Sequence, residues 1–286
     1  MNDAVPAVAE ADATGEIAEI FADIRQVLGV GTVNLIWRHL ATIPGALPWA
    51  WGRLRSIYMD GTIAGEAAKL RRALALPALL DIPAAIFAAA DLSDRDLDAI
   101  RNVLTAYDRT NPMALIALSA LSGQVDSTPY THHAGLLGTS PAEPQVVLPL
   151  PALLKLADAS PTTAELVLTL NRLGTRRKDP VLASMYLHLA HWPRYLALVW
   201  AMIAPLDADG RLAHAISDAV SLARASTPGI VARLPVSSDA ALEPVVRAAV
   251  REALERFAGD VIAKMVVICA LLREVSGGPR EKSVAQ

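Results

Sequence analysis

Few residues in this 286-residue chain have types and spacing that could carry chemistry. Asn111 precedes Pro112 at a predicted helix start, where an amide side chain commonly caps the helix. Such a helix start also offers backbone N–H donors and a favourable dipole to a carboxylate, and Arg38 could add a pairing charge or be an ordinary surface arginine. Asp260 stands 149 positions after Asn111 and is the carboxylate best placed to act as a base, or simply caps a second helix. These residues would suit a small anionic ligand.

The sequence gives little support to metal or thiol chemistry. His132 and His133 are adjacent, so they cannot easily face one ion together, and no carboxylate or cysteine is spaced nearby as a further ligand. Cys269 is the only cysteine, which excludes an intramolecular disulfide and a cysteine-rich zinc site and fits a reducing compartment. Thiol peroxidase chemistry is disfavoured because it needs a paired cysteine. We therefore predict no metal and no other cofactor.

A repeat runs through the chain. The segment from His39 to Trp51 recurs from His188 to Trp200, with an offset of 149 positions and no gap, and shares histidine, leucine, alanine, proline and tryptophan positions. The repeat predicts a tandem duplication of a multi-helix unit packed around a pseudo-two-fold axis. Because His188 repeats His39, the pattern favours a structural role for this histidine in both halves.

The composition favours helices throughout. Hydrophobic residues make up 53% of the chain, alanine and leucine dominate, and no strand pattern is evident, so the fold class is all-α. We predict a first helical repeat over 1–121, an exposed linker over 122–151, a second helical repeat over 152–275 and a flexible tail over 276–286. The linker is marked by clustered Gly, Ser, Thr and Pro and by the loss of periodicity.

Helix breakers divide each half into short helices. Breaks at Asn111, Pro228 and Asp260 predict separate helices over 93–107 and 113–121, over 212–224 and 228–234, and over 240–257 and 260–274. Two segments, 83–90 and 113–121, are apolar nearly all round and should be covered on every side. Packing of the two halves would cover them, and a cavity at that interface is a common place for a small-molecule site.

Charge and hydropathy exclude several partners. The net charge of −3 gives no electrostatic footprint for nucleic acid. The longest uncharged apolar runs are far shorter than the ~18–20 residues that cross a bilayer. The first residues lack the basic and apolar parts of a signal peptide. We expect a cytoplasmic protein with no nucleic-acid or membrane partner.

Short motifs follow one another through nearly the whole chain: Gly15-Glu16, Asp23-Ile24-Arg25, residues 40–51, Asn111-Pro112, Leu148-Pro149, Trp192-Pro193 and Arg256-Phe257 with Asp260. In order and spacing they resemble the group I, non-stereospecific DL-2-haloacid dehalogenases. The resemblance implies an all-helical, duplicated fold, a homodimer, and hydrolytic displacement of halide from C2 of a short 2-haloacid. In that family a carboxylate base activates a water that attacks directly, and an amide holds the water, so both enantiomers can be used.

The resemblance also assigns the reacting groups to positions in this chain. The amide that holds the water corresponds to Asn111, and the serine next to the base corresponds to Ser184. The catalytic aspartate, which stands seven residues before the tryptophan of Trp192-Pro193, corresponds to Met185. A thioether cannot accept a proton at neutral pH, so the expected base is missing.

The walls of the family's site are substituted too. An aromatic pair at the halide end corresponds to Thr32 and Leu35, and a tyrosine from the second half corresponds to Leu254. We therefore expect a haloacid dehalogenase-like protein that holds a short carboxylic acid between its halves and is no efficient dehalogenase. The alternative is an active hydrolase of the carbon–halogen bond in which another carboxylate replaces the missing base. Asp260 is the preferred candidate for this base, and Asp179 is the second.

Overall fold

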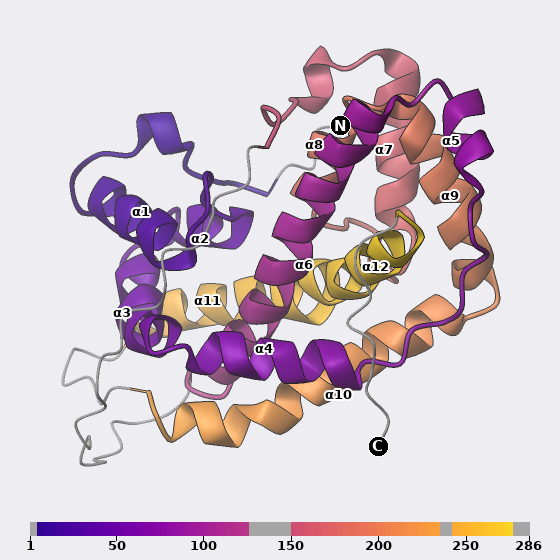
Figure 1. Ribbon diagram of the computed structural model, residues 1–286. Helices are drawn as coiled ribbons and strands as arrows, with labels where there is room; N and C mark the ends of the chain where they lie inside the picture. The colour runs from indigo at the N-terminus through magenta and orange to yellow at the C-terminus, as the bar shows by residue number, and fades with distance from the viewer. Residues whose placement is uncertain (1–4, 126–149, 235–241, 277–286) are drawn as a thin grey trace.

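A computed structural model describes residues 5–125, 150–234 and 242–276. All regular elements within these ranges are helical, which confirms the predicted all-α class (Figure 1). Most of the predicted linker, with His132 and His133, and all but the first residue of the predicted tail lie outside the described residues. The division into domains therefore stays a prediction.

The helices of the two halves follow one another in a similar order. The first half contains η1 (Glu10–Asp12), α1 (Gly15–Leu28), α2 (Leu35–Leu40), α3 (Ala46–Met59), α4 (Thr62–Ala73), α5 (Ala84–Ala89) and α6 (Asp94–Ser122). The second contains η2 (Leu156–Asp158), α7 (Pro161–Arg172), α8 (Ser184–Leu189), α9 (Pro193–Ala208), α10 (Arg211–Val231), α11 (Pro244–Arg256), η3 (Phe257–Val261) and α12 (Ile262–Val275). Both ends of α8 lie 149 positions after those of α2, the offset of the sequence repeat.

Helix α6 is continuous where the sequence predicted two helices. Its start agrees with the prediction, since Ser93 and Asp96 form a capping box. Pro112, however, lies inside the helix and does not begin a new one. A proline in a helix interior costs about 3 kcal/mol or more, but residues 111–118 are all buried, so their packing outweighs that cost. Asn111 is therefore not a helix cap.

The other two predicted breaks are also wrong. Pro228 lies inside α10, which runs unbroken to Val231. Between α11 and α12 the backbone does not leave the helix at Asp260 but passes through the π-helical turn η3. A π-turn holds one extra residue without ending the helix and is frequent at functional sites.

The core lies where α6 crosses α12 (Figure 1). Residues 261–269 are all buried, and so are the apolar residues of 113–121, which confirms the predicted covering of that segment. The prediction for 83–90 is wrong, because Phe87 is the one buried residue of α5. This helix is short and mostly alanine, so its exposure leaves little apolar area in water. Among the described residues, no helix has the length and apolar character needed to span a membrane.

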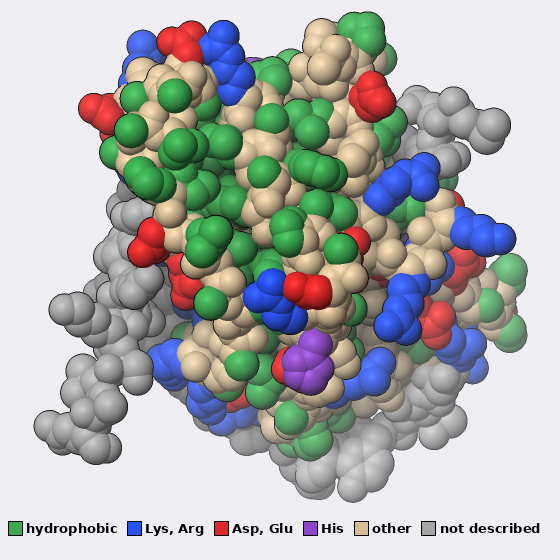
Figure 2. All heavy atoms as spheres, turned by 90° about the vertical axis from the view of Figure 1, so that its right-hand side faces the viewer, with side chains coloured by type: hydrophobic (Ala, Val, Ile, Leu, Met, Phe, Trp, Pro, Cys, Tyr) green, Lys and Arg blue, Asp and Glu red, His purple; other side chains and the backbone are tan. Residues whose placement is uncertain are grey.

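The side of the molecule that carries α5 and α9 is rich in apolar surface. Figure 2 views this side and shows hydrophobic side chains gathered over much of it. Ile86 of α5 and Trp200 of α9 are each 45% exposed. Contiguous apolar surface commonly marks a contact region, but the homodimer implied by the resemblance stays a prediction.

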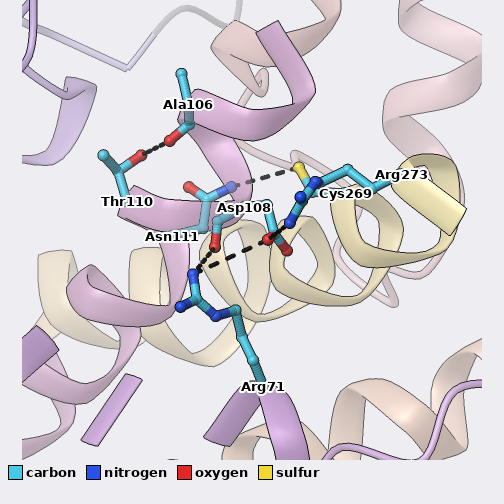
Figure 3. A network of polar contacts seen from close by, with 7 residues as sticks. All are labelled: Arg71, Ala106, Asp108, Thr110, Asn111, Cys269 and Arg273. Carbon is cyan, nitrogen blue, oxygen red and sulfur yellow. Dashed lines mark hydrogen bonds and ion pairs between the residues drawn. The ribbon is translucent and has the colours of Figure 1, made fainter. Parts of the chain in front are cut away.

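A buried ion cluster joins α6 to α12 and α4 (Figure 3). Asp108 of α6 is 3% exposed, and Oδ2 accepts a hydrogen bond from Nη1 of Arg273. Nη1 of Arg71 lies 4.0 Å from the same oxygen and donates to the Asp108 carbonyl at 3.4 Å. A buried carboxylate persists only when such partners compensate its lost hydration.

The substitution Asp108→Ala should lower the free energy of unfolding by about 3 kcal/mol, because it leaves two partly buried arginines without a counter-charge. Asp98→Ala on the same helix is the matched control. Its carboxylate pairs with Arg101 but is 71% exposed, so the loss should stay below about 1 kcal/mol. Urea titration measures both, and equal losses would contradict the structural role of the cluster.

The predicted duplication can be tested on coordinates. Residues 14–121 should superpose on 163–271 with the helices in the same order, since the offset of 149 recurs at α2 and α8. A solved structure in which the two sets of helices differ in order or direction would contradict it.

Candidate functional site

A cavity of about 170 Å³ lies between the loop that follows α1, the middle of α6 and the helix α8. Its lining comprises residues 29–35, 105–107, 109 and 110 with Arg38, Leu150, Leu153, Ser184 and His188. The volume is well above the ~10–15 Å³ that one water needs and below the ~300–1,000 Å³ of sites for drug-sized ligands. Both halves contribute, so the cavity has the size and place expected of a small-molecule site.

The N-terminal segment holds the first wall of the cavity. Helix α1 ends at Gly29, whose left-handed φ of 59° turns the chain into the loop. Glu10 fixes the far side of this loop, because Oε1 accepts a 2.8 Å hydrogen bond from the Val33 N–H and Oε2 accepts one from Arg25. Val8 and Arg38 form two hydrogen bonds. The Val8 N–H donates to the Arg38 carbonyl at 3.0 Å, and Nε of Arg38 donates to the Val8 carbonyl at 3.1 Å.

The charged groups of the lining are cationic. Arg38 donates Nε to Val8, and a guanidinium carries four further N–H donors. Arg109 donates Nη2 to the Leu28 carbonyl at 2.7 Å; burial and then the charge of Arg71 lower the pKa of Arg109. None of the described lining residues is an aspartate or glutamate. The cavity therefore favours an anionic ligand over a cationic one.

Neutral polar groups surround these charges. The side chains of Tyr107 and Ser184 approach each other between α6 and α8. Burial raises the pKa of Tyr107, with a smaller contribution from Cys269, while Ser184 opposes the change, so the phenol stays protonated. Thr110 lines the same wall and donates to the Ala106 carbonyl at 2.9 Å (Figure 3). The wall thus presents hydroxyls beside the guanidinium groups.

His188 is a buried imidazole in the cavity wall. It is 3% exposed, its ring stands edge-on to Tyr107 at 5.7 Å, and Nδ1 has no hydrogen-bond partner among the described residues. Burial lowers the pKa of His188 to about 4, with a smaller contribution from His191, so the ring is neutral at pH 7. Its repeat counterpart His39 differs, because Nδ1 lies 2.7 Å from the Pro6 carbonyl and the ring stacks on Phe257. The structural role favoured from the sequence suits His39 but leaves His188 unexplained.

Three of the predicted site residues, Thr32, Leu35 and Ser184, line the cavity. Asn111 and Met185 are each the next residue along from a lining residue, but both are buried in a sulfur-containing cluster. Nδ2 of Asn111 lies 3.7 Å from Sγ of Cys269 (Figure 3), and this sulfur lies 3.0 Å from Sδ of Met185. Asn111 and Met185, the positions that the resemblance implies for the amide and the base, thus both contact Sγ of Cys269.

Cys269 contributes packing rather than thiolate chemistry. It is fully buried, and burial raises the pKa of the thiol well above its usual value, so it stays protonated. A protonated, enclosed thiol is a poor nucleophile. The three side chains fill the space where the resemblance requires a base and a water.

The two remaining predicted residues lie away from the cavity lining. Leu254 is 1% exposed in α11. Asp260 is 8% exposed in η3, and its Oδ1 accepts a 2.6 Å hydrogen bond from Thr175. Its Oδ2 has no partner among the described residues. The helix-cap interpretation of Asp260 is wrong, and its carboxylate is turned toward the chain after α7.

Asp260 belongs to a second buried polar cluster. Lys264, one turn further on, is completely buried and donates Nζ to the Asn171 carbonyl. Burial lowers the pKa of Lys264 to about 8, while Asp260 and Asp207 oppose the change. Asp179, the other substitute considered, is 60% exposed and lies 3.3 Å from Arg256. Both carboxylates already have cationic neighbours of their own.

Sequence reasoning missed part of the lining. The predicted site residues did not include Tyr107, Arg109 or Thr110, and His188 was expected to have a structural role. The false helix break at Asn111 hid the fact that five residues of α6 line the cavity: Thr105, Ala106, Tyr107, Arg109 and Thr110. Among the described residues, no group of three or more His, Cys, Asp or Glu could hold a metal ion.

The low pKa of His188 predicts an acid-sensitive stability. Its pKa of about 4 lies below the usual ~6.5, so the unfolded chain binds more protons between these values and the free energy of unfolding rises with pH across this window. As pH falls from 6.5 to 4, wild type should lose up to about 3 kcal/mol relative to His188→Gln. His39→Gln should keep the wild-type dependence, and denaturant titration across this range measures it. Parallel curves for wild type and His188→Gln would contradict the assignment.

Comparison with known proteins supports a relationship to the 2-haloacid dehalogenases but not the non-stereospecific group. No family model matches the chain. The configuration-inverting 2-haloacid dehalogenase of Alcaligenes xylosoxydans xylosoxydans is 28% identical over 204 residues, 68% of this chain. The matched region spans 66% of that enzyme's own length.

Solved structures share the fold. A D-2-haloacid dehalogenase mutant in complex with D-2-CPA gives a TM-score of 0.78 at 18% identity. The enzyme in complex with L-LA gives 0.77, also at 18% identity. Each comparison covers 95% of this chain and 96% of the other. These descriptions specify inversion or the D form, whereas the motifs resemble the non-stereospecific group. The chain has the all-α fold of the D-2-haloacid dehalogenases and is similar in sequence to a 2-haloacid dehalogenase.

Proposed function

We propose that this protein binds a short carboxylic acid in the cavity between the α1–α2 loop, α6 and α8. The observation that carries the proposal is the composition of the cavity lining. It contains two arginines, hydroxyl groups and a neutral histidine, and none of its described residues is a carboxylate. Arginine is well suited to a carboxylate, because its planar fork can donate two parallel hydrogen bonds. The acid group would bind at Arg38, and the rest of the molecule would lie toward Leu35 and Ser184.

The similar proteins support the choice of ligand class. One is named for its action on 2-haloacids, and one solved relative holds D-2-CPA. In this chain the same class of ligand would meet cationic groups and a cavity of matching size. The non-stereospecific group stays our proposal from the motifs, and assays therefore need both enantiomers.

We further propose that the chain is not an efficient dehalogenase. Direct hydrolysis needs a base within about 2.6–3.2 Å of the attacking water. The position implied for that base is Met185, which is completely buried against Cys269. Asp260, the best substitute, lies outside the lining and is bonded to Thr175. Asn111 alone could orient a water but could not take its proton.

The cytoplasmic location and the homodimer expected from the sequence complete the proposal. The apolar side that carries Ile86 and Trp200 is the surface that a second copy would have available.

The acid-binding role of Arg38 is directly testable. Arg38→Leu should weaken the affinity for 2-hydroxypropionate at least tenfold, because a charge-assisted hydrogen bond to the carboxylate contributes ~1.5–3 kcal/mol. Arg194→Leu is the control, since this arginine is 62% exposed on α9 and outside the lining. Calorimetric titration measures both, and an affinity that Arg38→Leu leaves unchanged would refute the proposed site.

The absence of a base is tested by halide release. With either enantiomer of 2-chloropropionate, wild type should release halide ~10²–10⁴-fold more slowly than an active relative, the usual contribution of general-base catalysis. Met185→Asp should raise the rate, because it places a carboxylate near the Asn111 amide. Met185→Asn controls for polarity without basicity. Rapid halide release by wild type would overturn the proposal if the pH–rate profile fell at acidic pH with a pKa typical of a carboxylate. The variants Asp260→Asn and Asp179→Asn would then identify the base.

A further inference from the structure

We infer that His188 recognises an oxygen substituent of the bound acid, so that the cavity prefers a short hydroxy acid to the matching haloacid or unsubstituted acid. The inference rests on the proposed acid-binding function and adds to it the group beside the carboxylate. Nothing in the motifs or the relatives' names assigns a role to this histidine.

The first step is the hydrogen-bonding state of the ring. Buried polar atoms in folded proteins nearly always have a partner, yet Nδ1 of His188 has none among the described residues although the side chain is 3% exposed. The ring is part of the cavity lining. Nδ1 itself is enclosed in the unliganded protein, so a ligand supplies the missing hydrogen bond by a turn of the ring toward the cavity.

The second step is the contrast with the repeat counterpart. His39 occupies the corresponding position in α2, but its Nδ1 lies 2.7 Å from the Pro6 carbonyl and its ring is stacked on Phe257 at 5.5 Å. His188 keeps the aromatic neighbour, Tyr107 at 5.7 Å, but not the backbone hydrogen bond. Packing alone therefore accounts for His39 and not for the unmatched polar group of His188.

The third step is chemical complementarity. A neutral imidazole carries one donor and one acceptor nitrogen, and burial keeps the pKa of His188 at about 4, so it stays neutral at physiological pH. A hydroxyl is likewise both donor and acceptor. The halogen of a haloacid has no hydrogen to donate, and a methylene can do neither. Sites built to hydrogen-bond a substrate hydroxyl discriminate strongly against analogues without it.

The neighbouring groups place this contact beside the acid group. Ser184, one turn before His188 in α8, lines the cavity and lies near enough to Tyr107 to lower its pKa. Arg38 is close enough to lower the pKa of Tyr107 by its charge. A carboxylate at Arg38 would thus have the His188, Ser184 and Tyr107 side chains around its adjacent carbon.

The test compares three acids that differ at one position: 2-hydroxypropionate, 2-chloropropionate and propionate, each enantiomer separately. Calorimetric titration at pH 7 should show that wild type binds 2-hydroxypropionate at least about tenfold more tightly than the other two. His188→Phe should bind all three within about threefold of one another. His39→Phe, the matched control, should keep the wild-type preference, because His39 does not line the cavity and phenylalanine retains the stacking on Phe257.

A second measurement does not depend on the folding of a variant. Nitrogen NMR of the histidine rings in wild type should show that 2-hydroxypropionate shifts the His188 signals and leaves those of His39 in place, whereas propionate shifts neither. His188→Gln, which retains a donor and an acceptor, should keep part of the preference.

The outcomes separate the two proposals. If the three acids bind equally well, or if the preference survives His188→Phe, the role of His188 is refuted while acid binding stands. If none of the acids binds to the folded wild type, acid binding and the role of His188 are both refuted.

Discussion

The crossing of α6 on α12 is the constraint on which the rest of the structure depends. Both helices are apolar on nearly every side where they meet, so neither can be stable in water without the other. The Asp108–Arg273 pair sets how they cross, because a buried carboxylate tolerates few positions for its partner. One face of α6 then forms a wall of the cavity and the next face holds Asn111 against Cys269. The packing of α6 on α12 thus determines where this wall of the cavity lies.

Much of this architecture could be predicted from the sequence. Helical composition predicted the class, and the offset of 149 in the sequence repeat recurs between the ends of α2 and α8. The failures occurred where local signals met tertiary packing. Pro112 and Pro228 are strong breakers in isolation, but burial of the flanking residues stabilises the continuous helices. Propensity describes the free chain, and it cannot include the free energy of contacts with a distant segment.

The candidate site was less accessible to sequence reasoning. Thr32, Leu35 and Ser184, which the resemblance assigned to the site, line the cavity. Asp260 was favoured because it is a carboxylate at a repeat-related position, but only three-dimensional contacts reveal that it faces Thr175. For His188 the repeat misled, since identical residues at equivalent positions have different partners. Whether a polar side chain is satisfied is a property of its neighbours, which no single sequence displays.

The attachment of residues 6–10 to the cavity wall has a consequence for the shape of the cavity. The carbonyls of Pro6 and Val8 and the carboxylate of Glu10 accept hydrogen bonds from His39, Arg38 and the Val33 N–H. None of these three N-terminal residues lines the cavity, yet they hold two residues that do, Val33 and Arg38. Loss of these contacts would free one wall while α6 and α12 stayed packed, so the cavity could change shape without unfolding of the core.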